Sequence, residues 1–244
     1  MIDWKIQKTL LDNIPAAQFH AGSRIKFGPD HKLYVTTGDA TNKSLPQNKK
    51  SLGGKILRLN TDGTVPVDNP EEGSFIYSYG HRNPQGLAWD PKSGELYGTE
   101  HGPSGSDGPP GGDEVNHIVP GGNYGWPLVS HNDKYAGTEE PLRTFTPAIA
   151  PSGAMFYAGT LFPGLTGKLL FTGLIGEGLF TATIDAENPD HMYDTTKLSG
   201  IDVGRIRDVV EGPDGALYLL TSNRDSRGDV REGDDKVIRL TPGQ

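Results

Sequence analysis

Three polar clusters between residues 80 and 127 carry the side chains best suited to chemistry. They are His81-Arg82-Asn83-Pro84-Gln85-Gly86, then Glu100-His101-Gly102-Pro103, then Asp113-Glu114 leading to Gly122-Asn123-Tyr124-Gly125-Trp126-Pro127. Strands normally give way to Gly, Asn or Asp in a short turn, so charged and amide side chains at successive strand ends need another explanation. This spacing predicts a functional site rather than a set of ordinary turns.

Two of these clusters indicate a cofactor floor with a metal beside it. The guanidinium of Arg82 is a planar fork of five donors, which suits a carboxylate or a quinone oxygen. The Gly102-Pro103 turn can direct bare carbonyl oxygens toward a hard cation. The alternative is that Arg82 and Glu100 form an ordinary ion pair and that the glycines only make turns.

A His–Asp pair is the candidate for proton transfer. His20 precedes a predicted hairpin and Asp39 follows it, so both lie at the same edge of a sheet. A carboxylate there can bind one imidazole nitrogen and orient the other, as a general base requires. Such pairs are also common as structural contacts. The histidines without a comparable acidic neighbour are interpreted as surface or supporting residues: His31, His81, His117, His131 and His191.

Asp113, Glu114 and Tyr124 belong to a Gly-rich segment that offers carboxylates and many main-chain carbonyls. Oxygen ligands of this kind suit Ca²⁺ and not Zn²⁺. The segment therefore predicts a structural calcium site. Solvated acids on a flexible loop are the alternative.

Arg205 and Arg207 precede the last predicted hairpin. Alternate residues of a strand point to the same side, so the two guanidinium groups can grip an anionic cofactor together. They can equally pair with acids such as Asp202 and Asp208.

A recurring hairpin must position these side chains. Each copy is a strand, a turn with Gly, Pro or Asp, and a second strand, and the copies span residues 24–36, 86–99, 207–221 and, more loosely, 154–172. Further strands are predicted at 4–11, 55–59, 178–182 and 236–240. Hairpins that repeat without helical periodicity between them are typical of propeller blades.

The fold is therefore predicted to be all-β, a β-propeller with about four blades in a single domain over residues 1–244. Residues 1–15 are expected to supply the outer strand of a preceding blade. A β-sandwich would also show short strands and turns. It does not predict the repeated Pro-Asp-Gly-x-Leu-Tyr-x-x-Thr phrase.

Composition narrows the range of partners. The 244 residues carry a net charge of -8 and no basic block, which argues against nucleic acid and anionic lipid surfaces and favours a small-molecule partner. The chain has no cysteine, so a disulfide framework and thiolate chemistry are excluded. No apolar run approaches a membrane span, and the first residues alternate like a strand rather than a signal peptide.

The motifs together resemble the soluble, pyrroloquinoline quinone (PQQ)-dependent glucose/sorbosone and aldose sugar dehydrogenases, from about Trp4 to the end of the chain. The resemblance rests on the three clusters above and on His20-Ala21-Gly22-Ser23-Arg24, Gly38-Asp39, Ser51-Leu52-Gly53-Gly54-Lys55-Ile56-Leu57-Arg58-Leu59 and Asp113-Glu114-Val115-Asn116. These motifs in this order are highly specific.

The resemblance implies a six-bladed propeller that holds the quinone on its upper face and oxidises the C1 hydroxyl of an aldose to the lactone. It implies that His20 takes the hydroxyl proton while hydride passes to the quinone C5, that Asp39 holds His20, and that Arg82 polarises the quinone oxygen. It also implies an external electron acceptor, a periplasmic or secreted location and a possible homodimer.

The same resemblance implies further site residues. The cofactor contacts would be Arg82, Asn83, Gln85, His101, Arg205, Arg207 and, more weakly, Gln47. The carbonyls of Gly102 and Pro103 would ligate the Ca²⁺ that bridges quinone and protein. A second, structural Ca²⁺ would be held by Asp113, Glu114 and Tyr124.

Two departures from the family pattern bear on activity. The family continues for about two blades before the position of Met1, and some members carry a lysine where this chain reads Gly173-Leu174-Ile175-Gly176-Glu177-Gly178. An alternative is therefore a non-catalytic, calcium-stabilised propeller that serves as a binding or scaffold module. A lactonase-type hydrolase would need inward carboxylates or asparagines, one from each blade, to converge on one ion, whereas the acids here cluster in one segment.

Overall fold

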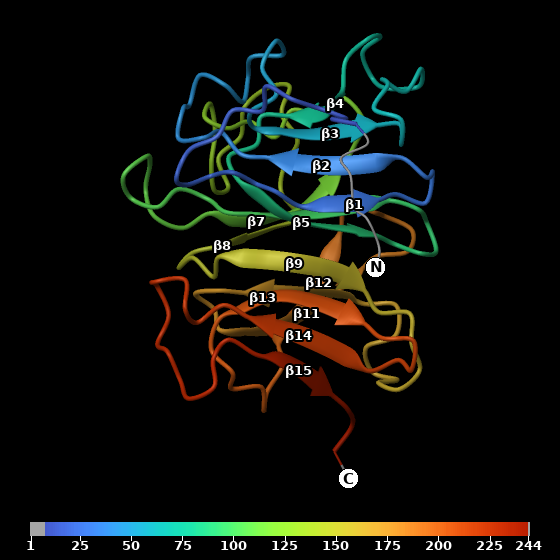
Figure 1. The fold of residues 1–244 in the computed structure, drawn as a ribbon, viewed down its shortest axis with the longest axis vertical. Helices are drawn as coiled ribbons and strands as arrows, with labels where there is room; N and C mark the ends of the chain where they lie inside the picture. The colour runs from blue at the N-terminus through green and yellow to red at the C-terminus, as the bar shows by residue number, and fades with distance from the viewer. Residues whose placement is uncertain (1–7, 244) are drawn as a thin grey trace, which may run out of the picture.

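The computed structural model describes residues 8–243 of the chain. All regular secondary structure there is β, with fifteen strands in four sheets. In Figure 1 the first sheet lies at the top of the view and the second below it, and the third and fourth overlap in the lower half, with β15 lowest. Within these residues no helix has the length and apolar character needed to cross a bilayer. The prediction of an all-β fold is confirmed.

The strand order within each sheet is the order along the chain. The first sheet holds β1 (Ile25–Phe27), β2 (Leu33–Thr37), β3 (Lys55–Leu59) and β4 (Ile76–Tyr79). The second holds β5 (Pro84–Trp89), β6 (Leu96–Glu100), β7 (Asp113–Ile118) and β8 (Arg143–Phe145). The third holds β9 (Pro151–Phe156), β10 (Leu169–Gly173), β11 (Gly178–Ile184) and β12 (Met192–Lys197), and the fourth holds β13 (Ile206–Glu211), β14 (Leu217–Thr221) and β15 (Val237–Leu240).

Every repeated hairpin of the sequence forms an antiparallel pair of strands. These pairs are β1 with β2, β5 with β6, β9 with β10 and β13 with β14. The strands predicted after three of them also exist, as β3, β11 and β15. The repeats predict about four blades, and the structure has four sheets.

The strand predicted at residues 4–11 is not supported where it can be judged. Residues 8–11 form no strand, and residues 4–7 lie outside the described part of the chain. The alternative of solvated acids on a flexible loop is wrong for Asp113 and Glu114, because both lie in strand β7, which pairs with β6 and β8. Its polar residues hid a strand whose Val115 and Ile118 are buried in the core.

Hydrophobic side chains fill the spaces between neighbouring sheets. One core cluster joins the first and second sheets around Tyr34, Ile56 and Leu87. Others join the second sheet to the third, and the third to the fourth, around Phe171 and Leu170 respectively. Consecutive sheets therefore pack directly against each other through these side chains.

The hairpins place chemically active residues at one end of the sheets. His20 precedes β1, Asp39 follows β2 and Arg82 precedes β5. Arg205 precedes β13 in the same way. The ends of antiparallel hairpins meet at one edge, so residues far apart in sequence come together there.

Candidate active site

His20, Asp39 and Arg82 form a connected group of side chains. The Nδ1 atom of His20 lies 2.8 Å from Oδ1 of Asp39, and the Nη2 atom of Arg82 lies 2.9 Å from Nε2 of His20. Asp39 is 1% exposed, whereas the His20 side chain retains 15% exposure. The buried carboxylate of Asp39 therefore holds the imidazole through Nδ1, and the ring remains accessible to solvent.

These partners fix the tautomer of His20. An ionised carboxylate only accepts hydrogen bonds and a guanidinium only donates them. The Nδ1–H of His20 therefore donates to Asp39, and the lone pair on Nε2 accepts from Arg82. A neutral imidazole with its lone pair on Nε2 is the form that a general base needs.

The local backbone is shaped for this contact. His20 has a φ of 57°, in the left-handed region that costs a residue with a side chain about 1–3 kcal/mol. At Gly38, an added Cβ would lie 1.9 Å from the carbonyl oxygen of His20. Only glycine allows the two segments to approach this closely, so Gly38 is required for the pair to form.

The Arg82 guanidinium is 4% exposed and uses its other donors on the loop that follows β6. Its Nε lies 2.7 Å from Oδ2 of Asp107, and its Nη1 lies 3.1 Å from the carbonyl oxygen of His101. Glu100 accepts hydrogen bonds from the main-chain amides of Arg82 and Asn83. The proposed Arg82–Glu100 side-chain ion pair is therefore not what the structure shows.

A cleft of about 1080 Å³ opens in front of this group. It is lined by residues in or next to strands of all four sheets, including Leu174 and Ile175 after β10, and by the loop after β6. Among its lining residues are His20, Asp39, Arg82, Asn83, Gln85, His101, Gly102, Pro103, Arg205 and Arg207. All but one of the predicted catalytic and cofactor-contacting residues thus gather in one place.

The floor of the cleft is an amide network. Oδ1 of Asn83 accepts from the amide of Gly22 at 3.1 Å and from Nε2 of Gln85 at 2.9 Å.

Burial, with the neighbouring Arg82 charge, lowers the pKa of His101 to about 3. His101 therefore stays neutral at physiological pH and can offer the cleft a hydrogen-bonding nitrogen but no charge.

The far wall of the cleft is cationic. Arg205 is held by Asp225, with Nη2 2.8 Å from Oδ2, rather than by the acids that the sequence suggested. Arg207 reaches the same carboxylate at 3.4 Å. Burial, and then the charges of Arg205 and Arg24, lower the pKa of the Arg207 guanidinium. An anionic ligand would relieve this crowding of positive charge.

Comparison with known proteins identifies the family. The family model for glucose/sorbosone dehydrogenases matches residues 3–231. The chain belongs to this family. It is 35% identical to the aldose sugar dehydrogenase YliI of Escherichia coli, an alignment that covers 91% of this chain and 60% of that protein. It is also 38% identical to a Synechocystis protein, covering 93% of this chain and 59% of the relative.

Solved structures agree with the sequence match. An oxidoreductase (glucose dehydrogenase) from Thermus thermophilus superposes with a TM-score of 0.85 at 47% identity, over 94% of this chain and 68% of the other. The PQQ-bound aldose sugar dehydrogenase of Streptomyces coelicolor gives a TM-score of 0.81 at 39% identity, over 94% and 64%. The propeller fold of the family is thereby confirmed, and this chain spans about 60% of the length of its curated relatives.

This glucose/sorbosone dehydrogenase family member also has a small cavity beside the cleft. The cavity measures about 10 Å³ and is lined by Glu100 and Glu114, among others. That is about the space one water-sized particle occupies. Burial, together with the charge of Glu100, raises the pKa of Glu114 to about 8. Two crowded carboxylates in a space this small are suited to a single cation.

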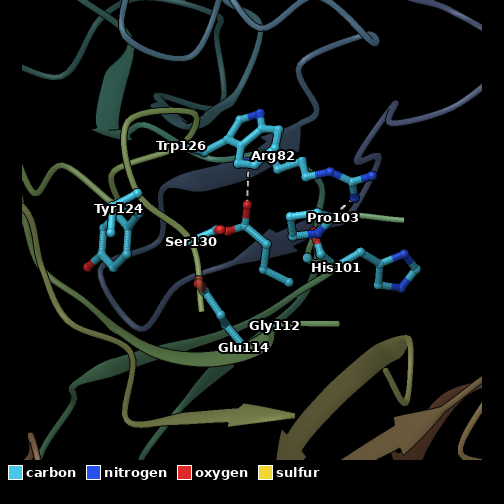
Figure 2. A pocket seen from close by; sticks show the side chains of 11 residues that line it. Arg82, His101, Pro103, Gly112, Glu114, Tyr124, Trp126 and Ser130 are labelled. Atoms are coloured by element: carbon cyan, nitrogen blue, oxygen red, sulfur yellow. Dashed lines mark hydrogen bonds between the residues drawn. The ribbon is translucent and has the colours of Figure 1, made fainter. Parts of the chain in front are cut away.

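Asp113 and Tyr124 contribute less to this cavity than the sequence suggested. The carboxylate of Asp113 accepts from the amides of Gly102 at 2.8 Å, Ile149 at 2.7 Å and Ala150 at 2.6 Å. It lines the large cleft and not the cavity that Glu114 lines. The Tyr124 hydroxyl donates to a main-chain carbonyl, and Figure 2 shows it pointing away from the cavity. Both side chains are already engaged in hydrogen bonds within the protein.

Main-chain oxygens must supply much of any metal site. No group of three or more His, Asp or Glu side chains gathers in metal-binding geometry among residues 8–243. Gly102 and Pro103 border both the cleft and the small cavity. At Gly102, an added Cβ would lie 2.3 Å from the carbonyl oxygens of Gly111 and Gly112. Residue 102 must therefore be glycine for the main chain of Gly111 and Gly112 to approach it this closely.

Two other expectations need correction. Gln47 does not line the cleft, because its Nε2 donates to Asn123 at 2.8 Å and to the carbonyl of Trp126 at 2.9 Å. His81 is not at the surface and does have an acidic partner. It is fully buried, with Nδ1 2.7 Å from Oε2 of Glu100. Gln47 thus contacts the Trp126 segment and His81 contacts Glu100, so both act on the site through neighbouring residues.

Neither the acids that hold the arginines nor the indole that contacts Asp39 was predicted from the sequence. Asp107 and Asp225 pair with Arg82 and Arg205, and Nε1 of Trp126 donates to Oδ2 of Asp39 at 2.8 Å. Asp107 lies in a Gly-, Ser- and Pro-rich loop and Asp225 in a polar loop, and neither loop has a periodic pattern. A charge argument could have found them, since a buried arginine requires a carboxylate partner.

Proposed function

We propose that this chain carries the site of a PQQ-dependent aldose dehydrogenase, which oxidises the C1 hydroxyl of an aldose to the lactone. The observation that supports this most directly is the imidazole of His20, held by Asp39 with the lone pair of Nε2 facing Arg82 and the cleft. The names of the relatives from Escherichia coli and Streptomyces coelicolor agree with this substrate class and cofactor.

His20 is the proposed general base. A sugar hydroxyl that enters the cleft displaces the Arg82 Nη2–H from Nε2 of His20 and donates its own proton there. The buried Asp39 carboxylate stabilises the imidazolium that results, as the acceptor of its Nδ1–H. General-base catalysis of this kind contributes about 10²- to 10⁴-fold to a rate.

The cleft fits the cofactor that the family uses. Arg205 and Arg207 provide a crowded cationic wall for carboxylates, and Arg82, Asn83 and Gln85 provide donors along the floor. The carbonyls of Gly102 and Pro103 would hold Ca²⁺ beside PQQ, and the two groups would supply a Lewis acid and a hydride acceptor. Arg82, released from His20, directs its freed N–H toward the cofactor.

The test is sugar-dependent reduction of an artificial electron acceptor by the purified chain with PQQ, Ca²⁺ and glucose. We expect turnover in the wild type and a loss of about 10²-fold or more in His20→Ala and Arg82→Ala, because each removes a group that contacts the reacting atoms. His191→Asn is the control, since that side chain is 58% exposed and outside the cleft.

The alternative is a calcium-stabilised propeller that binds or scaffolds without turnover. This alternative is favoured by exposed apolar side chains, which could contact another protein. They are Ile25 and Phe27 on β1 and Val210 on β13. This alternative predicts that Ca²⁺ raises the melting temperature while no aldose supports acceptor reduction. That pair of results would replace the enzymatic proposal.

A further inference from the structure

Trp126 links the two halves of the site. Its indole Nε1 lies 2.8 Å from Oδ2 of Asp39, and the ring centroid lies 5.6 Å from Cζ of Arg82. The side chain is 6% exposed, and Figure 2 shows it beside Arg82. We propose that Trp126 is a positioning residue that holds Asp39, and through it His20, in register with Arg82. This inference rests on the proposed function of His20 as the base.

The hydrogen bonds to Asp39 show why the indole matters. Oδ1 of Asp39 accepts from Nδ1 of His20 at 2.8 Å and from the amide of Thr41 at 2.8 Å. Oδ2 accepts from the indole of Trp126. The indole thus holds the oxygen opposite the imidazole and fixes the rotation of the carboxylate plane. Without it, Oδ2 loses this donor in a site that is only 1% exposed, and the carboxylate is held through Oδ1 alone.

The face of the indole supports the second partner. The Nζ atom of Lys43 lies 5.3 Å from the ring centroid, and Arg82 lies at a similar distance. Cations over an aromatic face are attracted by its quadrupole. The ring therefore acts on Arg82 by its face and on Asp39 by its edge, so one side chain relates the base to the guanidinium that contacts it.

The main chain of Trp126 is itself fixed by contacts with Gly80 and Gln47. The main-chain amide of Trp126 donates to the carbonyl of Gly80 at 2.8 Å, and its carbonyl accepts from Nε2 of Gln47 at 2.9 Å. Gln47 is paired through its amide with Asn123. The loop after β7 is thus anchored beneath the first sheet, which gives Gln47 a supporting role instead of the cofactor contact predicted for it.

The first experiment is Trp126→Phe in the enzyme loaded with PQQ and Ca²⁺. Phenylalanine keeps an aromatic face but removes the N–H donor. We expect kcat to fall about 10-fold or more while KM changes by less than about 3-fold, because the base is misaligned and the sugar contacts remain. Trp89→Phe is the matched control, since Trp89 packs against Tyr34 and lies outside the cleft. A variant with wild-type kcat would overturn the proposal.

A double-mutant cycle separates positioning from general support of the fold. If Trp126 acts through Asp39, then Trp126→Phe changes kcat by less than about 2-fold once Asp39→Asn is present, because residues that act as a unit are not additive. A purely structural tryptophan would instead cost the same factor in both backgrounds. Equal factors would therefore refute the positioning role even if Trp126→Phe alone slows the enzyme.

A third measurement needs no turnover and no cofactor. In the cofactor-free protein, the imidazole Nδ1–H resonance of His20 reports its hydrogen bond to Asp39. We expect Trp126→Phe to shift that resonance, and Asp39→Ala to shift the indole N–H resonance of Trp126 in a chain whose indole is intact. If neither resonance moves, Trp126 does not position the pair. If both move but no sugar is oxidised, the positioning contact stands and the proposed function fails.

Discussion

Lys55 is the residue whose environment gives the clearest prediction outside the site. Its side chain is fully buried, and its Nζ donates to the carbonyls of Leu45 at 2.9 Å, Pro46 at 2.9 Å and Gly53 at 2.6 Å. These carbonyls belong to the loop that also carries Gln47. Burial lowers the pKa of Lys55 from 10.5 to about 7.

This lowered pKa makes stability depend on pH. Between pH 7 and 10.5 the unfolded chain binds more protons at Lys55 than the folded chain, so the free energy of unfolding rises with pH in that window. We expect the wild type to gain more stability than Lys55→Met when urea denaturation is moved from about pH 6.5 to about pH 9. Equal gains in the two proteins would contradict the lowered pKa of Lys55.

Residue types alone predicted the His20–Asp39 contact, because both ends of a hairpin must share an edge. They could not predict Asp107 or Trp126 as partners in the same group. Asp107 reaches Arg82 from a loop, and Trp126 reaches Asp39 across 87 positions of sequence. Such contacts depend on how two sheets pack, which no spacing within either segment encodes.

At the level of elements, the inner strands were predictable and several outer ones were not. The inner hairpins alternate apolar and polar residues and repeat their turn phrase. By contrast β12 has only exposed and half-buried positions, and β8 is three residues long. Strands at a rim face water on one side and carry little hydrophobic pattern. The missed β4 has only four residues, a run too short for its alternating buried and half-buried positions to stand out in the sequence.

The packing between the second and third sheets can be tested at Phe171 of β10. This side chain is fully buried, stacks on Phe180 at 5.4 Å and meets Phe145 of the neighbouring sheet at 6.0 Å. We expect Phe171→Ala to lower the free energy of unfolding by about 3–5 kcal/mol, measured by urea denaturation. Tyr193→Ala on the exposed β12 is the control and should cost less than about 1 kcal/mol. Similar losses in both would show that the sheets are not packed as described.

At the scale of the whole molecule, an ion pair ties the first sheet to the last. The Nη1 atom of Arg24, which precedes β1, lies 2.6 Å from Oδ2 of Asp208 on β13. The Nε atom of Arg24 also donates to the carbonyl of Gln85 at 2.9 Å. This contact spans 184 residues of sequence and joins the wall with His20 to the wall with Arg207. The ion pair therefore ties two walls of the cleft together.

Two substitutions distinguish a geometric tie from a simple charge effect. We expect both Arg24→Met and Asp208→Asn to weaken PQQ binding, by about 10-fold in a fluorescence titration, because each releases one wall from the other. If only the local charge matters, Asp208→Asn should instead tighten binding of an anionic ligand. Opposite effects of the two variants would therefore exclude the tie.

The most direct measurement is a crystal structure of this chain with PQQ and Ca²⁺ bound. Our account predicts the quinone in the cleft, with its carboxylates toward Arg205 and Arg207, the ion on the carbonyls of Gly102 and Pro103, and Nε2 of His20 open toward the remaining space for a sugar. A quinone bound elsewhere on the molecule, or a His20 displaced from Asp39 when the quinone is in place, would contradict it.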